Sequence, residues 1–148
     1  MKKSILITLV FMLAACSIGG SEFARNQQKW NDANIRHYRF QLTVGCFCPF
    51  GDQMPLTVEV LNGKVVSITA KDGSTVIQGD PSYETFARYA TIDNLFTELK
   101  ADLGGKADQV TVTYDATYGF PSTINIDFIK NAVDDELYLS TTGFEKLP

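Results

Sequence analysis

Histidine is nearly absent from this chain: the 148 residues contain one, His37, together with one tryptophan and three cysteines. Hydrolases that use a Ser-His or Cys-His pair need a histidine beside the nucleophile, and no Gly-x-Ser-x-Gly nucleophile elbow occurs here. No pair of carboxylates is placed by the sequence in a recognisable glycosidase arrangement. The chain is therefore expected not to be an enzyme of these classes, and no cofactor is expected.

An excess of basic residues is also missing. The chain carries 13 Lys and Arg against 17 Asp and Glu, and removal of Lys2 and Lys3 with a leader would leave 11 − 17 = −6. Binding to nucleic acid gains its affinity from clustered Lys and Arg, and no such cluster is present. We therefore expect no nucleic-acid partner, and weak repulsion from anionic lipid headgroups.

No apolar run is long enough to cross a bilayer, which takes about 20 helical residues. The run Ser4–Leu13 has about ten, follows Lys2 and Lys3, and ends in Leu13-Ala14-Ala15-Cys16. This order of charge, apolar stretch and small residues predicts a secretory signal peptide over residues 1–15. Its end resembles the lipobox of bacterial lipoproteins, in which the cysteine becomes the first residue. The alternative is an ordinary cleaved signal with an incidental cysteine.

The lipobox resemblance implies that Cys16 carries diacylglycerol on its sulfur and an acyl chain such as palmitate on its amine. Stable membrane anchoring takes at least two such signals, because each buried methylene contributes about 0.8 kcal/mol. The expected location is the bacterial cell envelope, with the membrane as a partner through the N-terminal lipid. Ser17, in place of an aspartate, resembles an outer-membrane sorting signal, facing the periplasm, if the host is Gram-negative.

The remaining chain is long enough for one domain with one core. Residues 16–22 are expected to form the lipidated cysteine and a flexible tether, Ser17-Ile18-Gly19-Gly20-Ser21, ahead of a single domain over residues 23–148. Several segments alternate apolar and polar residues, which is typical of antiparallel strands with one wet face. These segments lie around residues 38–44, 56–60, 66–70, 110–114, 124–128 and 137–144.

Helical patterns precede and interrupt these strands. Ser21–Arg36 is expected to be helical, with a helical turn at Tyr83–Arg88. Thr91 is expected to cap an amphipathic helix that Gly104-Gly105 ends, with an apolar face at helical spacing. That face comprises Ile92, Leu95, Phe96, Leu99 and Leu103. The predicted fold is α+β: an antiparallel β-sheet of five or six strands with one or two helices packed on one face.

The hairpin at Asn62-Gly63 has two possible registers. A two-residue turn would pair Val58 with Ser67 and place a serine on the core face. A three-residue loop with Gly63 left-handed pairs Val58 with Val66 and Leu56 with Ile68, which keeps the apolar sets together. We therefore predict a type I turn with a glycine bulge.

The segment Cys46-Phe47-Cys48-Pro49 is the main candidate for chemistry. With Cys16 used for lipid, Cys46 and Cys48 form an even pair in an exported domain, which favours a disulfide. Extended residues two apart have Cα atoms about 6.6 Å apart, so a modest bend permits the bond. Its loop is so short that it would add only about 1.6 kcal/mol. A redox-active pair, a copper(I) or zinc site and free thiols remain alternatives.

Three further sets of polar or aromatic residues each have two possible interpretations. Asp134-Asp135-Glu136 is read as a solvated turn rather than a calcium site, because the alternating ligand loop is missing. The aromatic loop Tyr114–Pro121 either closes the core or forms an exposed contact patch. The wet sheet face either holds a polar ligand or is an ordinary solvated face; its residues include Thr111, Thr113, Asn125 and Asp127.

Three segments together resemble a family of bacterial lipoproteins classed as domain of unknown function 6174. They are the strand leading into Cys46-Phe47-Cys48-Pro49, the helix start Thr91–Phe96, and the run from Tyr114-Asp115 through Tyr118–Pro121 to Asp134-Asp135-Glu136. The resemblance covers about residues 30–142. It implies an envelope lipoprotein and supplies no activity, substrate or catalytic residue.

The sequence thus leads to two hypotheses. The first is a lipid-anchored, non-enzymatic binding module for an envelope or secreted protein. Its expected contact loop comprises Phe47, Pro49, Phe50, Tyr118 and Phe120. The alternative is a thiol-redox or metal-binding envelope protein that acts through Cys46 and Cys48.

Overall fold

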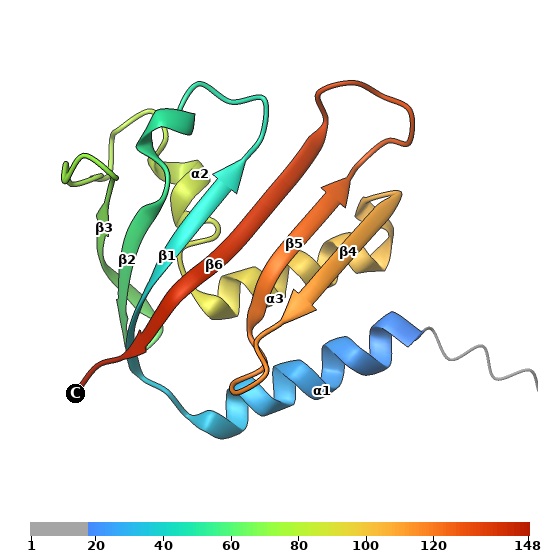
Figure 1. The fold of residues 1–148 in the computed structure, drawn as a ribbon, viewed down its shortest axis with the longest axis horizontal. Coiled ribbons are helices and arrows are strands. Elements are labelled where there is room, and N and C mark those ends of the chain that lie inside the picture. The colour runs from blue at the N-terminus through green and yellow to red at the C-terminus, as the bar shows by residue number, and fades with distance from the viewer. Residues whose placement is uncertain (1–17) are drawn as a thin grey trace, which may run out of the picture.

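The computed structural model describes residues 18–148, which form one antiparallel sheet and its covering helices (Figure 1). The predicted leader and Cys16 lie outside the described residues. The six strands are ordered β3-β2-β1-β6-β5-β4 in the sheet. Their bounds are β1 (His37–Gly45), β2 (Leu56–Leu61), β3 (Lys64–Thr69), β4 (Gln109–Tyr114), β5 (Pro121–Asp127) and β6 (Glu136–Lys146). The predicted α+β class with an antiparallel sheet is confirmed.

The helices lie against one face of this sheet, and α1 runs along its lower end in Figure 1. They are α1 (Ile18–Ala33), the short α2 (Tyr83–Ala87) and α3 (Ile92–Ala101), which continues as the π-helical turn η2 (Asp102–Lys106). A 3-10 turn, η1 (Gly51–Gln53), follows β1. Helix α1 begins at Ile18, within the stretch that the sequence predicts as the tether. Among the described residues, no helix is long and apolar enough to span a membrane.

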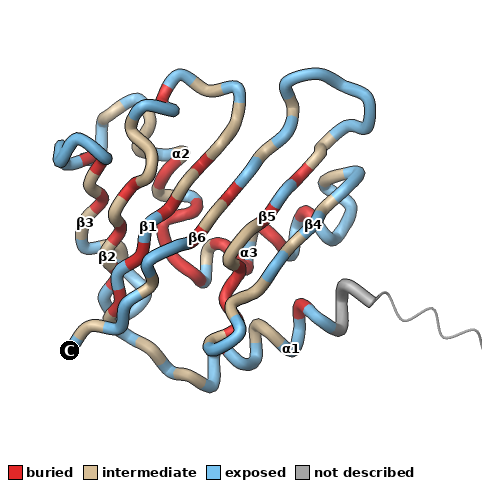
Figure 2. Tube along the Cα trace, viewed as in Figure 1, coloured by how far each residue is buried: buried red, intermediate tan, exposed pale blue. Residues whose placement is uncertain are grey.

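The core lies between the sheet and the helices, where the buried residues gather (Figure 2). Strand β1 shows the predicted alternation: Tyr38, Phe40, Leu42 and Val44 are buried, and Arg39 between them is exposed. This alternation follows from the two-residue period of a strand, which sends successive side chains to opposite faces.

Helix α3 is fixed at its start by two side chains. Thr91 caps it as predicted, accepting a hydrogen bond from the amide of Asn94 at 3.0 Å. The hydroxyl of Tyr38 accepts another from the amide of Ile92 at 3.1 Å. Burial raises the pKa of Tyr38, so the phenol stays neutral. At the other end, the α-helix stops at Ala101, and Leu103 is 39 % exposed instead of joining the predicted apolar face.

Helix α1 is held by its single tryptophan. Trp30 is buried, and its indole nitrogen donates to Asp93 Oδ1 at 3.0 Å, which ties α1 to the start of α3. Its ring meets those of Tyr38, Phe120 and Phe144 edge-on, with centroids 5.4–6.1 Å apart. Such edge-to-face pairs add packing energy beyond burial alone.

The β2–β3 hairpin differs from the prediction. Leu61 pairs with Lys64 and Val60 with Val65, so the loop is the two-residue Asn62-Gly63 turn, and both residues have positive φ (51° and 74°). The predicted three-residue loop is therefore wrong.

The apolar register is restored by a bulge instead. The pairing shifts by one residue between Glu59 and Val60, after which Val58 faces Ile68. The extra residue lies in β3, where Val66 is 55 % exposed. A bulge inside the strand thus lets the favourable Asn-Gly turn coexist with an apolar inner face.

Candidate functional site

The residues expected to form one contact loop lie at opposite ends of the sheet. The segment after β1 carries Phe47, Pro49 and Phe50, whereas Tyr118 and Phe120 lie in the β4–β5 turn beside α1 (Figure 1). Phe50 and Phe120 are buried, and Tyr118 is half-buried. The structure therefore does not bring these five residues onto one surface.

The β4–β5 turn closes the core. The Phe120 ring lies 4.7 Å from that of Phe144, and the Tyr118 ring lies 5.5 Å from the same ring. Gly119 (φ 79°) approaches α1 so closely that a Cβ there would lie 2.5 Å from the carbonyl oxygen of Asn26. The structure thus favours core closure over an exposed aromatic patch.

The segment Cys46–Cys48 presents one aromatic side chain to solvent. The two cysteines are joined by a disulfide, with Cα atoms 5.1 Å apart, and the amide of Cys48 donates to the carbonyl of Cys46 at 2.8 Å. Phe47, between them, is 85 % exposed. Phe50, three residues later, is buried edge-on against Phe86 with centroids 4.8 Å apart. The backbone that carries the exposed ring is thus fixed by the disulfide and, three residues later, by the buried ring of Phe50.

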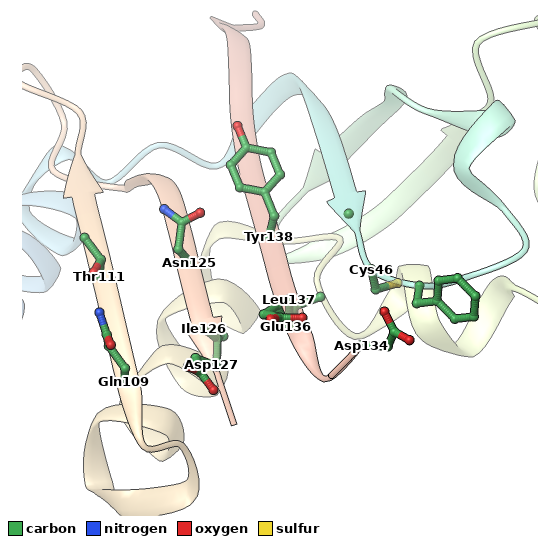
Figure 3. A pocket seen from close by; sticks show the side chains of 12 residues that line it. Cys46, Gln109, Thr111, Asn125, Ile126, Asp127, Asp134, Glu136, Leu137 and Tyr138 are labelled. Carbon is green, nitrogen blue, oxygen red and sulfur yellow. The ribbon is translucent and has the colours of Figure 1, made fainter. Parts of the chain in front are cut away.

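Beside this segment, the outer face of the sheet is hollowed over the ends of four strands (Figure 3). The hollow has a volume of about 470 Å³. Its upper row crosses the sheet through directly opposed residues: Thr111, Asn125, Tyr138 and Gly45. Tyr138 is 40 % exposed, and its ring lies against Gly45, where a Cβ would be 3.3 Å from Tyr138 Cδ1. A glycine at the end of β1 therefore leaves room for the ring.

The lower row of the hollow is acidic. Gln109 faces Asp127, which faces Glu136 on β6, and Asp134 follows in the adjoining loop. Within the described part of the chain, residues 18–148, no Lys or Arg lines the hollow. Asp127 Oδ1 is buried without a hydrogen-bond partner, and the ion pairs found among residues 18–148 involve other carboxylates. The hollow therefore concentrates negative charge.

A second, smaller hollow of about 280 Å³ lies on the other side of the disulfide, between β6 and α2. Arg88 lines it and pairs with Glu98 at 2.5 Å. This hydrogen bond raises the pKa of Arg88 and lowers that of Glu98. The arginine is thus engaged in an ion pair next to the cysteines.

The only histidine lies far from the cysteines, at the opposite end of β1. His37 Nε2 is 2.9 Å from Glu59 Oε1, and its Nδ1 is 2.7 Å from the carbonyl oxygen of Pro148. The bond with the Glu59 carboxylate raises the pKa of His37. In the part of the chain that the structure describes, no group of three His, Cys, Asp or Glu side chains is placed to hold a metal ion. In the Asp134–Glu136 segment, Asp135 Oδ2 accepts from the amide of Ile129 at 2.6 Å, as in an ordinary loop.

A comparison with protein-family models matches residues 22–146 to a family of unknown function, DUF6174. The chain belongs to DUF6174. The match covers every strand of the sheet and both sides of the hollow, so the described site lies wholly within the DUF6174 region. Searches of the curated proteins and of the solved structures find no match.

The site of this DUF6174 member was only partly visible in its sequence. The alternating pattern of the sequence places Thr111, Asn125 and Asp127 on the wet face, and all three line the hollow. Tyr138 and Gly45 were not recognised. The alternation Leu137-Tyr138-Leu139 places Tyr138 on the outer face, but only the pairing of β6 with β1 puts it against Gly45.

Proposed function

We propose that this DUF6174 protein is a lipid-anchored, non-enzymatic binding module of the bacterial cell envelope, and that Phe47 is the centre of its contact surface. The observation that carries this proposal is the 85 % exposure of a phenylalanine fixed between two disulfide-bonded cysteines. Phe47 covers no core residue, so the fold itself gains little from it.

An aromatic side chain in this setting suits a protein partner. Burial of a phenylalanine on binding contributes about 1.5–3 kcal/mol, and interface hot spots are enriched in aromatic rings. The bridge removes backbone freedom before binding, so less entropy is lost when the partner arrives. The neighbouring β5–β6 loop adds Ile129 and Val133, which are 62 % and 82 % exposed. Its Asp134 lines both hollows together with Phe47.

The anchor in this proposal is the lipid on Cys16. One residue, Ser17, separates Cys16 from Ile18, the first residue of α1. A lipid on Cys16 would therefore hold the start of α1 close to the membrane. We propose the cell envelope as the location, with the outer membrane as the site in a Gram-negative host.

Lipidation is tested by mass spectrometry of the mature protein and by incorporation of labelled palmitate. The wild type is expected to carry the added mass of a diacylglyceryl group and an acyl chain. A Cys16→Ser variant is expected to lose both. An unmodified mature N-terminus in the wild type would refute the anchor and leave the binding surface to be tested separately.

The contact surface is tested by crosslinking in intact envelopes with a photoreactive residue at position 47, compared with position 66. Val66 is exposed on the edge strand β3, remote from the disulfide, and serves as the matched control. Crosslinks are expected at position 47 and not at position 66. In affinity capture, the Phe47→Ala variant is expected to lose the partner protein that crosslinking identifies, whereas the Val66→Ala variant is expected to retain it. Equal capture by both variants would show that the surface is wrong.

Mass spectrometry of the same mature protein distinguishes a structural disulfide from the thiol-redox or metal-binding alternative. A mature protein that persists two mass units below its reduced form, in the presence of mild reductant, supports a structural disulfide. Ready reduction, or a bound metal in the native mass spectrum, would support the alternative through Cys46 and Cys48.

A further inference from the structure

The hollow on the outer face contains a charge arrangement that the fold leaves uncompensated. Asp127 and Glu136 are directly opposed on neighbouring antiparallel strands, and like charges in such pairs destabilise a sheet. Asp134 adds a third carboxylate to the lining. Asp127 Oδ1 is buried and accepts no hydrogen bond within residues 18–148.

A cationic group is the ligand that relieves the repulsion between these carboxylates. An anion would be repelled by the three carboxylates, and a neutral ligand would desolvate them without compensating their charge. Among the described residues, the side chains of Asp127, Asp134 and Glu136 are not placed to coordinate a metal ion together. A lysine ammonium or arginine guanidinium donates to carboxylates with charge-assisted bonds. Tyr138 also lines the hollow, and an aromatic ring attracts a cation.

The surroundings of the hollow indicate that this cation belongs to a polypeptide. Phe47 lines the rim at 85 % exposure, and Val133 precedes Asp134 at 82 % exposure. A free amine would fill the hollow and leave both apolar side chains in water. A polypeptide segment can place one basic side chain in the hollow and an apolar side chain on Phe47. The volume of about 470 Å³ is within the range of small-molecule sites, so the hollow has room for one long basic side chain.

We propose that the hollow formed by Thr111, Asn125, Asp127, Glu136 and Tyr138 binds a lysine or arginine side chain of a partner polypeptide whose adjacent apolar residue packs on Phe47. This inference rests on the proposed function, because it specifies the chemistry of the partner at the same surface. Clefts lined by charge of one sign also attract oppositely charged partners from a distance, so association should slow as salt is added.

The test is a selection of random heptapeptides on the immobilised full chain, held in detergent micelles. Bound peptides are sequenced for the wild type, for Asp127→Asn/Glu136→Gln, and for Glu84→Gln/Glu145→Gln. The last pair makes the same change in net charge at exposed carboxylates outside the hollow. The wild type and this control are expected to enrich Lys and Arg at least tenfold over the Asp127→Asn/Glu136→Gln variant. The variant removes a like-charge pair, so it should fold, which its urea transition confirms.

The outcomes separate this inference from the proposed function. Equal enrichment on the wild type and on Asp127→Asn/Glu136→Gln, or no enrichment of basic peptides at all, overturns the inference. Phe47-dependent capture in envelopes would then still stand. A Phe47→Ala chain is expected to keep the preference for Lys and Arg while losing the preference for an adjacent apolar residue. Retention of both preferences by Phe47→Ala overturns the polypeptide arrangement proposed here.

Discussion

Tyr138 on β6 and Gly45 at the end of β1 face each other across the sheet, so closely that a methyl group on Gly45 would lie 3.3 Å from both Cβ and Cδ1 of Tyr138. A side chain at position 45 would crowd this ring. This contact sets where the aromatic wall of the hollow stands, and it can be measured as a coupling between two substitutions.

Gly45→Ala is expected to destabilise the protein by about 1 kcal/mol, because the added methyl crowds the Tyr138 ring. In a Tyr138→Ala background the contact with Cδ1 is gone and only the contact with Cβ remains, so the same substitution is expected to cost less. Urea denaturation of the four proteins gives the coupling energy. Equal costs in both backgrounds would rule out the contact as the cause.

Gly119→Ala is expected to be more costly than Gly73→Ala. Both glycines have left-handed φ values, 79° and 89°, so each substitution adds backbone strain of about 1–2 kcal/mol. Only at Gly119 does the new Cβ meet backbone, the Asn26 carbonyl oxygen of α1 at 2.5 Å, whereas nothing lies within 4 Å at Gly73. We expect an additional loss of about 1–3 kcal/mol at Gly119. Urea midpoints compare the two, and similar losses would contradict the close approach.

Two threonines of α3 are expected to respond to alanine with opposite signs. Thr91→Ala removes the N-cap hydrogen bond to Asn94 and should cost about 1 kcal/mol. Thr97 lies inside the helix, exposed, with its hydroxyl bonded to the Asp93 carbonyl, so Thr97→Ala should stabilise by a few tenths of a kcal/mol through helix propensity. Thermal unfolding of both variants tests this. A loss at Thr97 as large as that at Thr91 would show that the cap is not the cause.

Asp102 is expected to make the stability of the protein depend on pH, with a sign that follows from its burial. It is 3 % exposed, and burial raises the pKa of its carboxyl above the ordinary 3.8. The folded chain therefore binds this proton more tightly than the unfolded chain, and stability falls as pH rises from about 4 through the folded pKa. Asp102→Asn removes that fall. The variant is expected to gain stability relative to the wild type as pH increases to 7, measured as urea midpoints across the range.

Glu98 is expected to give stability the opposite pH dependence to that of Asp102, and so serves as its control. Its hydrogen bond with Arg88 lowers the pKa of its carboxyl below 4.5, so the stability it contributes is present above that pH and is lost as pH falls through the folded pKa. Glu98→Gln is expected to lose stability at pH 7 and to match the wild type in strong acid. Parallel pH profiles for the two variants would refute both assignments.

Local patterns predicted much of this fold because they act over a few residues. The alternation around Tyr38–Val44 and the cap at Thr91 depend on neighbours in sequence, and both are found in the structure. The β2–β3 turn was predicted wrongly because two local rules conflicted there. The Asn-Gly pair favours a two-residue turn, the apolar pattern favoured a longer loop, and a bulge near Val66 satisfies both. No pattern in the sequence predicts that bulge.

Aromatic residues in loops show the same limit. Phe47 follows β1 and Phe120 precedes β5, and the sequence predicts both at the contact surface. Phe120 is buried because the turn that carries it lies against Trp30 and Phe144, which come from α1 and β6. Phe47 is exposed because its segment projects beyond the sheet between two hollows. Burial of a loop residue depends on distant elements, so composition cannot decide it.

The period of each strand, the start of α3 and the proximity of Cys46 to Cys48 follow from the amino-acid sequence, because each depends on the geometry of adjacent residues. The position of β6 between β1 and β5 depends instead on how the whole chain packs. That order places Gly45, Tyr138, Asn125 and Thr111 in one row and Asp127 opposite Glu136. Strand order is selected by the packing of the whole core, which no local period encodes, and the hollow exists only because of it.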